Sequence, residues 1–294
     1  MSEHFGEVLT AMVTPFDKNL EVNMKKVREL ANYLIDNGSD GLVVLGTTGE
    51  VPTLTKKEKI SILENVVDEV GENATIVAGT GSYSTYDSID LTKKAESIGV
   101  DGIMLVGPYY NKPPQAGLYQ HYSMIAQETS LPIMVYNVPS RTSKNIEPDT
   151  IKKLSKIDNI IAVKEASGDA AQIATISRKT ADDFYVYSGD DNFTLPTLAV
   201  GGQGIISVAS HLAGNEIKNM IKAFKTGNIE QASKLNQKLG ELFSGIFITT
   251  NPIPVKAALN MTGMEVGSLR PPLIELDNAK KQKLKKILQN QNLI

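Results

Sequence analysis

The chain has 294 residues, of which 41% are hydrophobic and 21% are charged, and its net charge is −3. These values are typical of a globular protein, and the absence of a Lys/Arg-rich block argues against a nucleic-acid partner, whose site needs a concentrated positive field. The chain contains no cysteine, which excludes disulfides, thiolate metal sites and a cysteine nucleophile. No apolar run approaches the roughly 18 residues of a membrane span, and Met1–Glu7 lacks the pattern of a secretory signal, so we expect a cytoplasmic protein.

Short and nearly continuous apolar runs recur along the first two thirds of the chain. They are Val8–Val13, Leu42–Leu45, Thr75–Ala78, Ile103–Val106, Ile133–Tyr136, Ile160–Val163, Phe184–Tyr187 and Gly204–Val208. Such runs predict strands that are buried on both faces. Amphipathic stretches with helical spacing lie between them, among them Met24–Ile35, Lys57–Val70 and Ser88–Ile98. Eight alternating units of strand and helix predict an α/β fold, the closed (β/α)8 or TIM barrel, whose usual length is about 250 residues.

A doubly wound open sheet is the alternative architecture, but no Gly-x-Gly-x-x-Gly motif follows the first predicted strand. After residue 226 the strand pattern stops, and the remaining chain predicts helices at Ile229–Phe247, Pro254–Met261 and Asp277–Gln289. Asn251-Pro252 and Pro271-Pro272 separate these helices, because proline interrupts a helix. We therefore expect a catalytic barrel over residues 1–226 and a C-terminal helical extension, residues 227–294, packed on it.

Polar residues follow most of the predicted strands, and Lys164 is the most informative of them. Barrel enzymes carry their catalytic groups at the carboxyl ends of the strands and in the loops that follow. Lys164 continues the apolar run Ile160–Val163 without a break, so we expect it to belong to the strand. Burial disfavours the charged form of lysine, and a neutral amine is the nucleophile that forms a Schiff base with a carbonyl substrate. The plainer interpretation is a lysine that points outward between helices or pairs with Glu165.

Other candidates occupy equivalent positions and also have plainer interpretations. The hydroxyl of Tyr136 could move protons beside an imine, or Tyr136 could be a core residue. Thr47 and Thr48 could hold a substrate carboxylate, or their Gly-Thr-Thr-Gly stretch could be only a tight turn. Arg141 could bind a carboxylate through two hydrogen bonds, or it could be solvated. The three histidines are too scattered to predict a metal site: His4, His121 and His211.

The motifs together resemble those of the dihydrodipicolinate synthase family. This family belongs to a superfamily with N-acetylneuraminate lyase and 2-keto-3-deoxy-gluconate aldolase. The resemblance covers nearly the whole chain and is carried by Gly46–Glu50, Gly79–Gly81, Pro108–Asn111, Tyr136–Thr142, Val163–Glu165, Ser188–Asp191 and Asn251–Lys256. The Gly-x-Thr-Gly-Glu loop and the lysine are shared across the superfamily, whereas Tyr-Asn-Val-Pro-Ser-Arg-Thr points to the synthase.

The resemblance implies that Lys164 condenses with pyruvate and that the resulting enamine attacks the aldehyde of L-aspartate 4-semialdehyde. The product would be 4-hydroxy-tetrahydrodipicolinate, the first committed intermediate toward diaminopimelate and lysine. No cofactor and no metal are implied, because Lys164 itself carries pyruvate. The residues matching Tyr136, Thr47 and Tyr110 form a proton relay in the family.

The resemblance also implies how the substrates are held. Thr48 would bind the pyruvate carboxylate, Arg141 would bind that of the semialdehyde, and main-chain groups of Gly189 and Ile206 would line the pocket. The family is usually a homotetramer built as a dimer of dimers, in which the residue matching Tyr110 reaches into the neighbouring site.

Two other functions remain possible at this stage. An N-acetylneuraminate lyase or related sugar-acid aldolase would share Lys164 and Tyr136, but the lyases lack the pattern that contains Arg141. A non-catalytic pyruvate-binding protein would need a broken relay, and the relay residues are all present.

Feedback by L-lysine is the last property on which the resemblance bears. Lysine-sensitive members carry Ser, Ala, His, His, Asn and Glu in the inhibitor pocket. The corresponding positions here are Val51, Pro52, Lys56, Lys59, Tyr83 and Asp87, while Tyr109 is retained. We therefore expect a degenerate feedback site.

Overall fold

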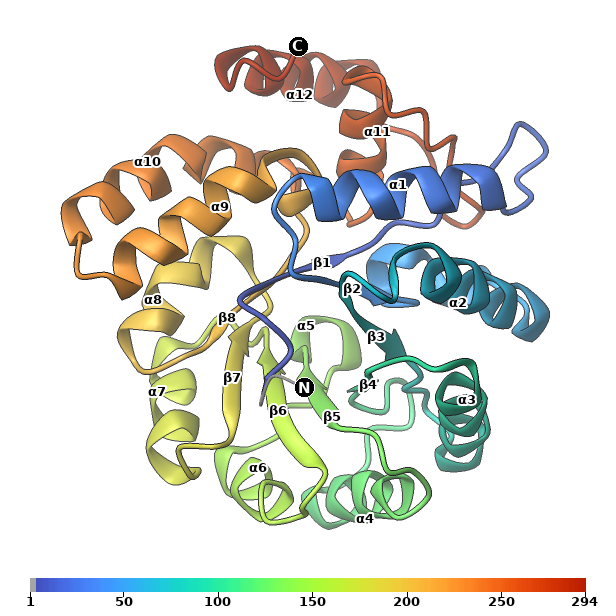
Figure 1. The fold of residues 1–294 in the computed structure, drawn as a ribbon, viewed down its shortest axis with the longest axis vertical. Coiled ribbons are helices and arrows are strands. Elements are labelled where there is room, and N and C mark those ends of the chain that lie inside the picture. Colours follow the sequence, from blue (N-terminus) through green and yellow to red (C-terminus); the bar gives the residue numbers. More distant parts are fainter. Residues whose placement is uncertain (1–3) are drawn as a thin grey trace.

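The chain folds into a closed barrel of eight parallel strands in the order of the sequence (Figure 1). A computed structural model describes residues 4–294, so the first three residues of Met1–Glu7 lie outside the described residues. The strands are β1 (Val8–Ala11), β2 (Gly41–Val44), β3 (Thr75–Gly79), β4 (Gly102–Val106), β5 (Ile133–Asn137), β6 (Ile160–Glu165), β7 (Tyr185–Ser188) and β8 (Gly204–Ser207). Pairing of β1 with both β2 and β8 closes the barrel. The predicted (β/α)8 fold is confirmed.

The strands are short and apolar because both of their faces are covered. One set of buried side chains packs outward against the helices, and Val8, Leu42, Ile103 and Val163 belong to it. A second set fills the interior of the barrel: Leu9, Ala11, Val43, Val77, Met104, Met134, Tyr136, Ala162, Tyr187 and Ile206. Alternation between these two environments leaves no strand face for polar residues, which explains the continuous apolar runs in the sequence.

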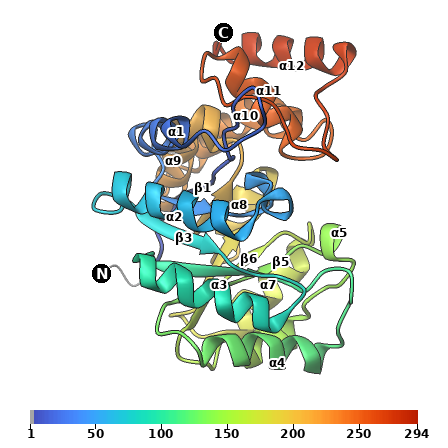
Figure 2. The ribbon, with the colours of Figure 1, turned by 90° about the vertical axis from the view of Figure 1, so that its right-hand side faces the viewer.

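Helices surround the strands on the outside of the barrel (Figure 1). They are α1 (Met24–Asp36), α2 (Lys56–Val70), α3 (Thr85–Ile98), α4 (Gln115–Ala126), α6 (Pro148–Leu154), α7 (Ala170–Lys179), α8 (Thr194–Ala199) and α9 (Ser210–Lys225), whereas the short α5 (Pro139–Thr142) lies over one end of the barrel. Local signals fix where they begin, as at α2, where Thr55 and Glu58 form a reciprocal capping box. In the side view α5, which follows β5, lies at one end of the barrel (Figure 2).

Three more helices follow the barrel: α10 (Ile229–Gly245), α11 (Ile253–Met261) and α12 (Asn278–Asn290). They gather at one side of the molecule, where the chain ends (Figures 1 and 2). Helix α10 packs on α9, and α12 packs on α10 and α11. Their buried faces include Leu242 and Phe243 of α10 and Leu284 and Leu288 of α12, which belong to the same apolar core as the outer barrel. No helix of the described residues is long and apolar enough to cross a membrane.

Candidate active site

A cavity of about 210 Å³ opens at the end of the barrel where the strands terminate. Six of the eight residues proposed from the sequence line it: Thr47, Thr48, Tyr136, Arg141, Lys164 and Gly189. Tyr136 and Lys164 lie at the ends of β5 and β6, and the other four follow β2, β5 and β7, so the six are distant in sequence and meet only because the barrel closes. The position agrees with the general rule that barrel enzymes hold their active sites at the carboxyl ends of the strands.

Lys164 points into this cavity from β6. Register pairs it with Tyr136 on one side and with Tyr187 on the other, and its side chain is only 5% exposed. Its Nζ lies 4.3 Å from the centre of the Tyr136 ring. Burial lowers the pKa of Lys164 from 10.5 to about 7; Asp191 opposes this shift, and the positive charge of Arg141 adds to it. A substantial neutral fraction therefore exists at neutral pH, which is the form that attacks a carbonyl.

The adjacent Glu165 does not pair with Lys164, because successive side chains of a strand point to opposite faces. Glu165 is buried among amides and accepts hydrogen bonds from Asn137 Nδ2 and Gln172 Nε2 at 3.0–3.1 Å, and from the backbone of Ser167. The plainer interpretation of Lys164, an outward or Glu165-paired side chain, is not what the structure shows.

Tyr136 lies beside Lys164, at the end of the neighbouring strand β5. It is 6% exposed, and burial raises the pKa of its hydroxyl, whereas Arg141 and a hydrogen bond with Thr47 lower it. The phenol therefore keeps its proton at neutral pH and can donate it or pass it on. Thr47 begins a short 3-10 turn (Thr47–Gly49) directly after β2, which brings its hydroxyl to the phenol.

Arg141 approaches the cavity from α5, a single helical turn after β5. Its Nη2 donates a hydrogen bond to the backbone carbonyl of Asn251 at 3.3 Å, and the rest of the side chain is exposed. This places a permanent positive charge at the opening of the cavity rather than at its base. A guanidinium in this position can bind a carboxylate through two parallel hydrogen bonds.

Three of the proposed positions have special geometry. A Cβ on Gly189 would lie 2.7 Å from the Cβ of Ala166 and 3.1 Å from Lys164 Cε, so only glycine leaves room for the lysine. The side chain of Ile206 faces the barrel interior and does not line the cavity. Tyr110 is 92% exposed with φ of 69° and also lies outside the cavity of the single chain.

The structure brings two residues to the site for which the sequence suggested no role. Asn251 lines the cavity, and its Nδ2 donates to Thr48 Oγ1 at 2.8 Å. Asp191 is buried behind the site, where it accepts hydrogen bonds from the hydroxyl of Ser207 and from two backbone N–H groups. Burial raises the pKa of Asp191 to about 6, and its charge favours the protonated form of Lys164.

The histidines lie apart from this chemistry. His121 and His211 are both buried, and burial lowers the pKa of each to about 4. His211 Nε2 accepts a hydrogen bond from the backbone of Val13, which makes it a structural residue. Residues 4–294 contain no group of three or more His, Asp or Glu side chains that could hold a metal ion.

Two further cavities lead away from the site. One of about 190 Å³ shares Thr47, Tyr136 and Arg141 with it. The next, of about 430 Å³, shares Tyr109 with the second and extends between α2 and α3. All six positions that were compared with lysine-sensitive proteins line this third cavity: Val51, Pro52, Lys56, Lys59, Tyr83 and Asp87.

Comparison with known proteins agrees with this geometry. The model of the dihydrodipicolinate synthetase family matches residues 4–291. The chain belongs to this family. A 4-hydroxy-tetrahydrodipicolinate synthase of Desulforudis audaxviator is 56% identical over 294 residues, which is 100% of both chains.

Solved structures give the same result. The dihydrodipicolinate synthase of Bacillus anthracis is 52% identical with a TM-score of 0.95, covering 97% of this chain and 98% of that one. The enzyme of Cyanidioschyzon merolae, solved with lysine bound, is 44% identical with a TM-score of 0.97 and 99% coverage of both. The predicted activity, that of a 4-hydroxy-tetrahydrodipicolinate synthase and hence of a lyase, is confirmed, and the sugar-acid lyase is not favoured.

Proposed function

We propose that Lys164 is the residue that carries pyruvate through the reaction. The neutral amine attacks the ketone carbon, and the carbinol oxygen leaves as water to give an imine. Loss of a methyl proton gives an enamine, whose carbon attacks the aldehyde of L-aspartate 4-semialdehyde. The amine of that substrate then attacks the imine carbon and displaces Lys164, which releases 4-hydroxy-tetrahydrodipicolinate. The observation that supports this assignment is a buried lysine with a pKa of about 7 in the cavity at the strand ends.

These steps need a group that gives and takes protons, and we assign this relay to Tyr136, Thr47 and Tyr110. Tyr136 is supported by its buried phenol, whose ring lies beside the Lys164 amine, and by its hydrogen bond with Thr47. Tyr110 is exposed in the single chain, so its part in the relay requires a partner subunit. No cofactor enters the scheme, since the lysine supplies the electron sink.

Substrate binding divides between the base and the opening of the cavity. We assign the pyruvate carboxylate to Thr48, which is buried close to the lysine, and the semialdehyde carboxylate to Arg141 at the opening. Gly189 would line the pocket beside the lysine, where no side chain fits. Ile206 would contribute only main-chain groups, because its side chain belongs to the barrel interior.

The assembly and location of the chain belong to the same proposal. We propose a cytoplasmic homotetramer built as a dimer of dimers, with Tyr110 completing the neighbouring site and with no nucleic-acid or membrane partner. Within each subunit, residues 1–226 would form the catalytic barrel and residues 227–294 an extension that packs on it. The third cavity, between α2 and α3, would no longer bind L-lysine as a feedback inhibitor.

Reductive trapping tests the central assignment. Borohydride added with pyruvate is expected to leave one reduced pyruvate unit on Lys164 and to abolish activity. Lys164→Ala should show no adduct, whereas Lys152→Ala, which removes an exposed lysine of α6, should be trapped like the unmodified protein. An adduct that peptide mapping places on another residue would refute the assignment. A coupled assay with aspartate semialdehyde, against one with N-acetylmannosamine, separates the synthase from a lyase and from a protein that only binds pyruvate.

A further inference from the structure

Asn251 occupies a junction between the C-terminal extension and the cavity. It lies in the turn between α10 and α11 and is 6% exposed. Its side-chain Nδ2 donates to Thr48 Oγ1 at 2.8 Å, and its backbone carbonyl accepts from Arg141 Nη2 at 3.3 Å. One residue therefore touches both side chains to which we assign a substrate carboxylate.

The hydrogen bond to Thr48 determines what the threonine hydroxyl can do. A hydroxyl has one proton to donate and two lone pairs that accept. The amide of Asn251 occupies one lone pair, so the hydroxyl proton must point elsewhere, and both residues line the cavity. A carboxylate can only accept hydrogen bonds. The contact with Asn251 thus leaves Thr48 poised as a donor to such a group.

The carbonyl end of the Asn251 side chain gives a second observation. Within the described residues, Oδ1 is buried and has no hydrogen-bond partner. Buried polar atoms are rarely left without a partner, so an orphaned acceptor beside a cavity indicates that a donor arrives with a ligand or with water. The carbinol that precedes the imine is such a donor.

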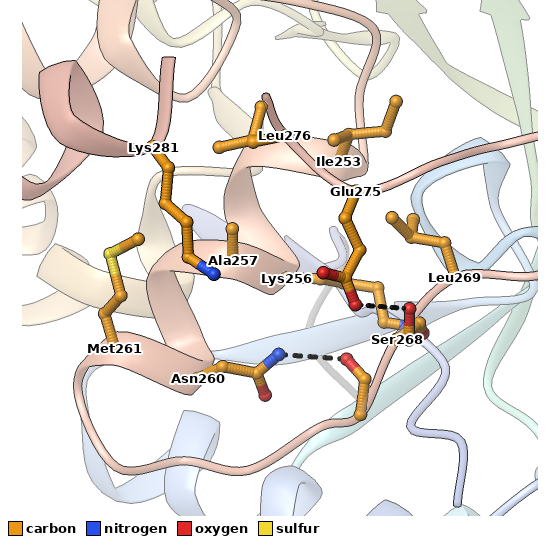
Figure 3. A pocket seen from close by; sticks show the side chains of 11 residues that line it. Ile253, Lys256, Ala257, Asn260, Met261, Ser268, Leu269, Glu275, Leu276 and Lys281 are labelled. Carbon is orange, nitrogen blue, oxygen red and sulfur yellow. Dashed lines mark hydrogen bonds between the residues drawn. The ribbon is translucent and has the colours of Figure 1, made fainter. Parts of the chain in front are cut away.

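A second contact with the same C-terminal segment fixes Glu50, the residue directly after the turn that carries Thr48. Glu50 is buried and forms an ion pair with Lys256 of α11, with 2.9 Å between Oε1 and Nζ. Lys256 Nζ also donates to the backbone carbonyls of Thr14 and Ser268. Figure 3 shows Lys256 beside Ser268 at the edge of a separate cavity of about 250 Å³. The segment from Asn251 to Lys256 thus holds both ends of the turn.

We propose that Asn251 is a positioning residue, which orients the Thr48 hydroxyl toward the pyruvate carboxylate while Lys256 fixes the turn. The proposal rests on the role assigned to Thr48 in the proposed function. It explains why the helical extension, whose residues carry none of the proposed chemistry, reaches the rim of the barrel at this point.

The first test is the pyruvate dependence of borohydride trapping. Asn251→Ala should raise the half-saturating pyruvate concentration roughly tenfold, because a charged acceptor then meets a hydroxyl that is no longer oriented. The KM for aspartate semialdehyde should change less than about twofold, since Arg141 bonds to the main chain, which the substitution retains. Asn260→Ala is the matched control. It removes an amide of α11 that donates to the carbonyl of Gly267 at the separate cavity of Figure 3, outside the active-site cavity, and it should leave both constants unchanged.

Asn251→Asp provides a variant of the same size. Aspartate only accepts hydrogen bonds, so it draws the Thr48 proton toward itself and turns the hydroxyl away from the substrate. Its loss of pyruvate affinity should be at least as large as that of Asn251→Ala. An Asn251→Asp protein that binds pyruvate as the unmodified protein does would overturn the proposal.

A double-mutant cycle distinguishes orientation from general damage to the fold. In a Thr48→Val background no hydroxyl remains to be oriented, so Asn251→Ala should add less than about a twofold effect. Independent, multiplying effects of the two substitutions would show that Asn251 does not act through Thr48. If the unmodified protein itself gave no adduct, the assignment of Lys164 would fail instead. Failure of the proposed function and failure of the proposal for Asn251 therefore give different results.

Discussion

Breaking the buried ion pair between Lys256 and Glu50 from one side should strongly lower the free energy of unfolding. The two side chains are 1% and 0% exposed, and 2.9 Å separates Nζ from Oε1. The carboxylate is further held by the backbone N–H of Arg270, which donates to its other oxygen at 2.9 Å. In Lys256→Met the aliphatic part of the side chain is kept, while the charge and three donated hydrogen bonds are lost.

The expected loss of stability in Lys256→Met follows from the buried Glu50 carboxylate, which is left without its partner. A buried carboxylate without its partner typically destabilises a protein by about 3–5 kcal/mol. At roughly 2–4 °C per kcal/mol, the melting temperature should fall by on the order of 10 °C. The double variant Lys256→Met, Glu50→Gln should recover part of this loss, because a neutral amide replaces the stranded charge and still accepts from Arg270.

Far-ultraviolet circular dichroism is the suitable probe, because the chain contains no tryptophan for a fluorescence assay. Lys218→Met is the matched control. It removes an ion pair with Asp40 whose side chains are 44% and 24% exposed, and such pairs contribute about 0–1 kcal/mol. A Lys256→Met protein that unfolds no earlier than Lys218→Met would refute the reasoning, as would a double variant less stable than the single one.

Three further predictions concern the reaction. Arg141→Ala should lower kcat/KM for aspartate semialdehyde by about one to two decades, from loss of a charge-assisted hydrogen bond, while trapping of pyruvate persists; an unchanged kcat/KM contradicts the assignment. Mixing inactive Tyr110→Phe and Lys164→Ala chains should restore some activity, because one site of the hybrid dimer then holds both native residues; verified hybrids without recovery would mean that Tyr110 acts within its own chain or not at all. The rate of adduct formation should rise with pH through about 7, where Lys164 loses its proton, and a profile flat between pH values of about 6 and 8 would oppose this.

The strand pattern and the buried position of Lys164 could be predicted from the sequence because both depend on local chain properties. A strand buried on both faces must be apolar along its whole length, so runs such as Ile160–Val163 identify it directly. Lys164 follows that run, and the side chains two residues apart on a strand share one face, so it shares the environment of Ala162 in the barrel interior.

The role of Asn251 could not be predicted in this way. In the sequence, Asn251-Pro252 appears only as an interruption between two helices. Its contact with Thr48 joins residues 203 positions apart, and the contact between Lys256 and Glu50 joins residues 206 positions apart. Neither pair has a local signature, because each is created by the return of the helical extension to the barrel rim. The resemblance to the family included this stretch but assigned no role to it.

The last prediction concerns the third cavity and L-lysine. Lys56 forms an ion pair with Asp90 across it, so that carboxylate is already neutralised and does not serve an incoming ammonium group. Lys59 is half-buried beside Asp87, and burial lowers its pKa. Tyr83 packs edge-on against Tyr109, with 5.3 Å between ring centres, so an aromatic ring stands at the position where lysine-sensitive members carry an amide.

L-lysine brings two ammonium groups and one carboxylate, so its ammonium groups meet Lys56 and Lys59 in a cavity where one of the two lining carboxylates, that of Asp90, is already paired. Each repulsion at about 4 Å is worth on the order of 1 kcal/mol in water and 4 kcal/mol in a partly buried cleft. We therefore expect no inhibition by L-lysine at millimolar levels when pyruvate is subsaturating. Lys56→His combined with Tyr83→Asn removes one positive charge and restores an amide, and an increase in sensitivity there would show that these two positions set the response. Strong inhibition of the unmodified protein would mean that the ion pair between Lys56 and Asp90 opens to admit the ligand.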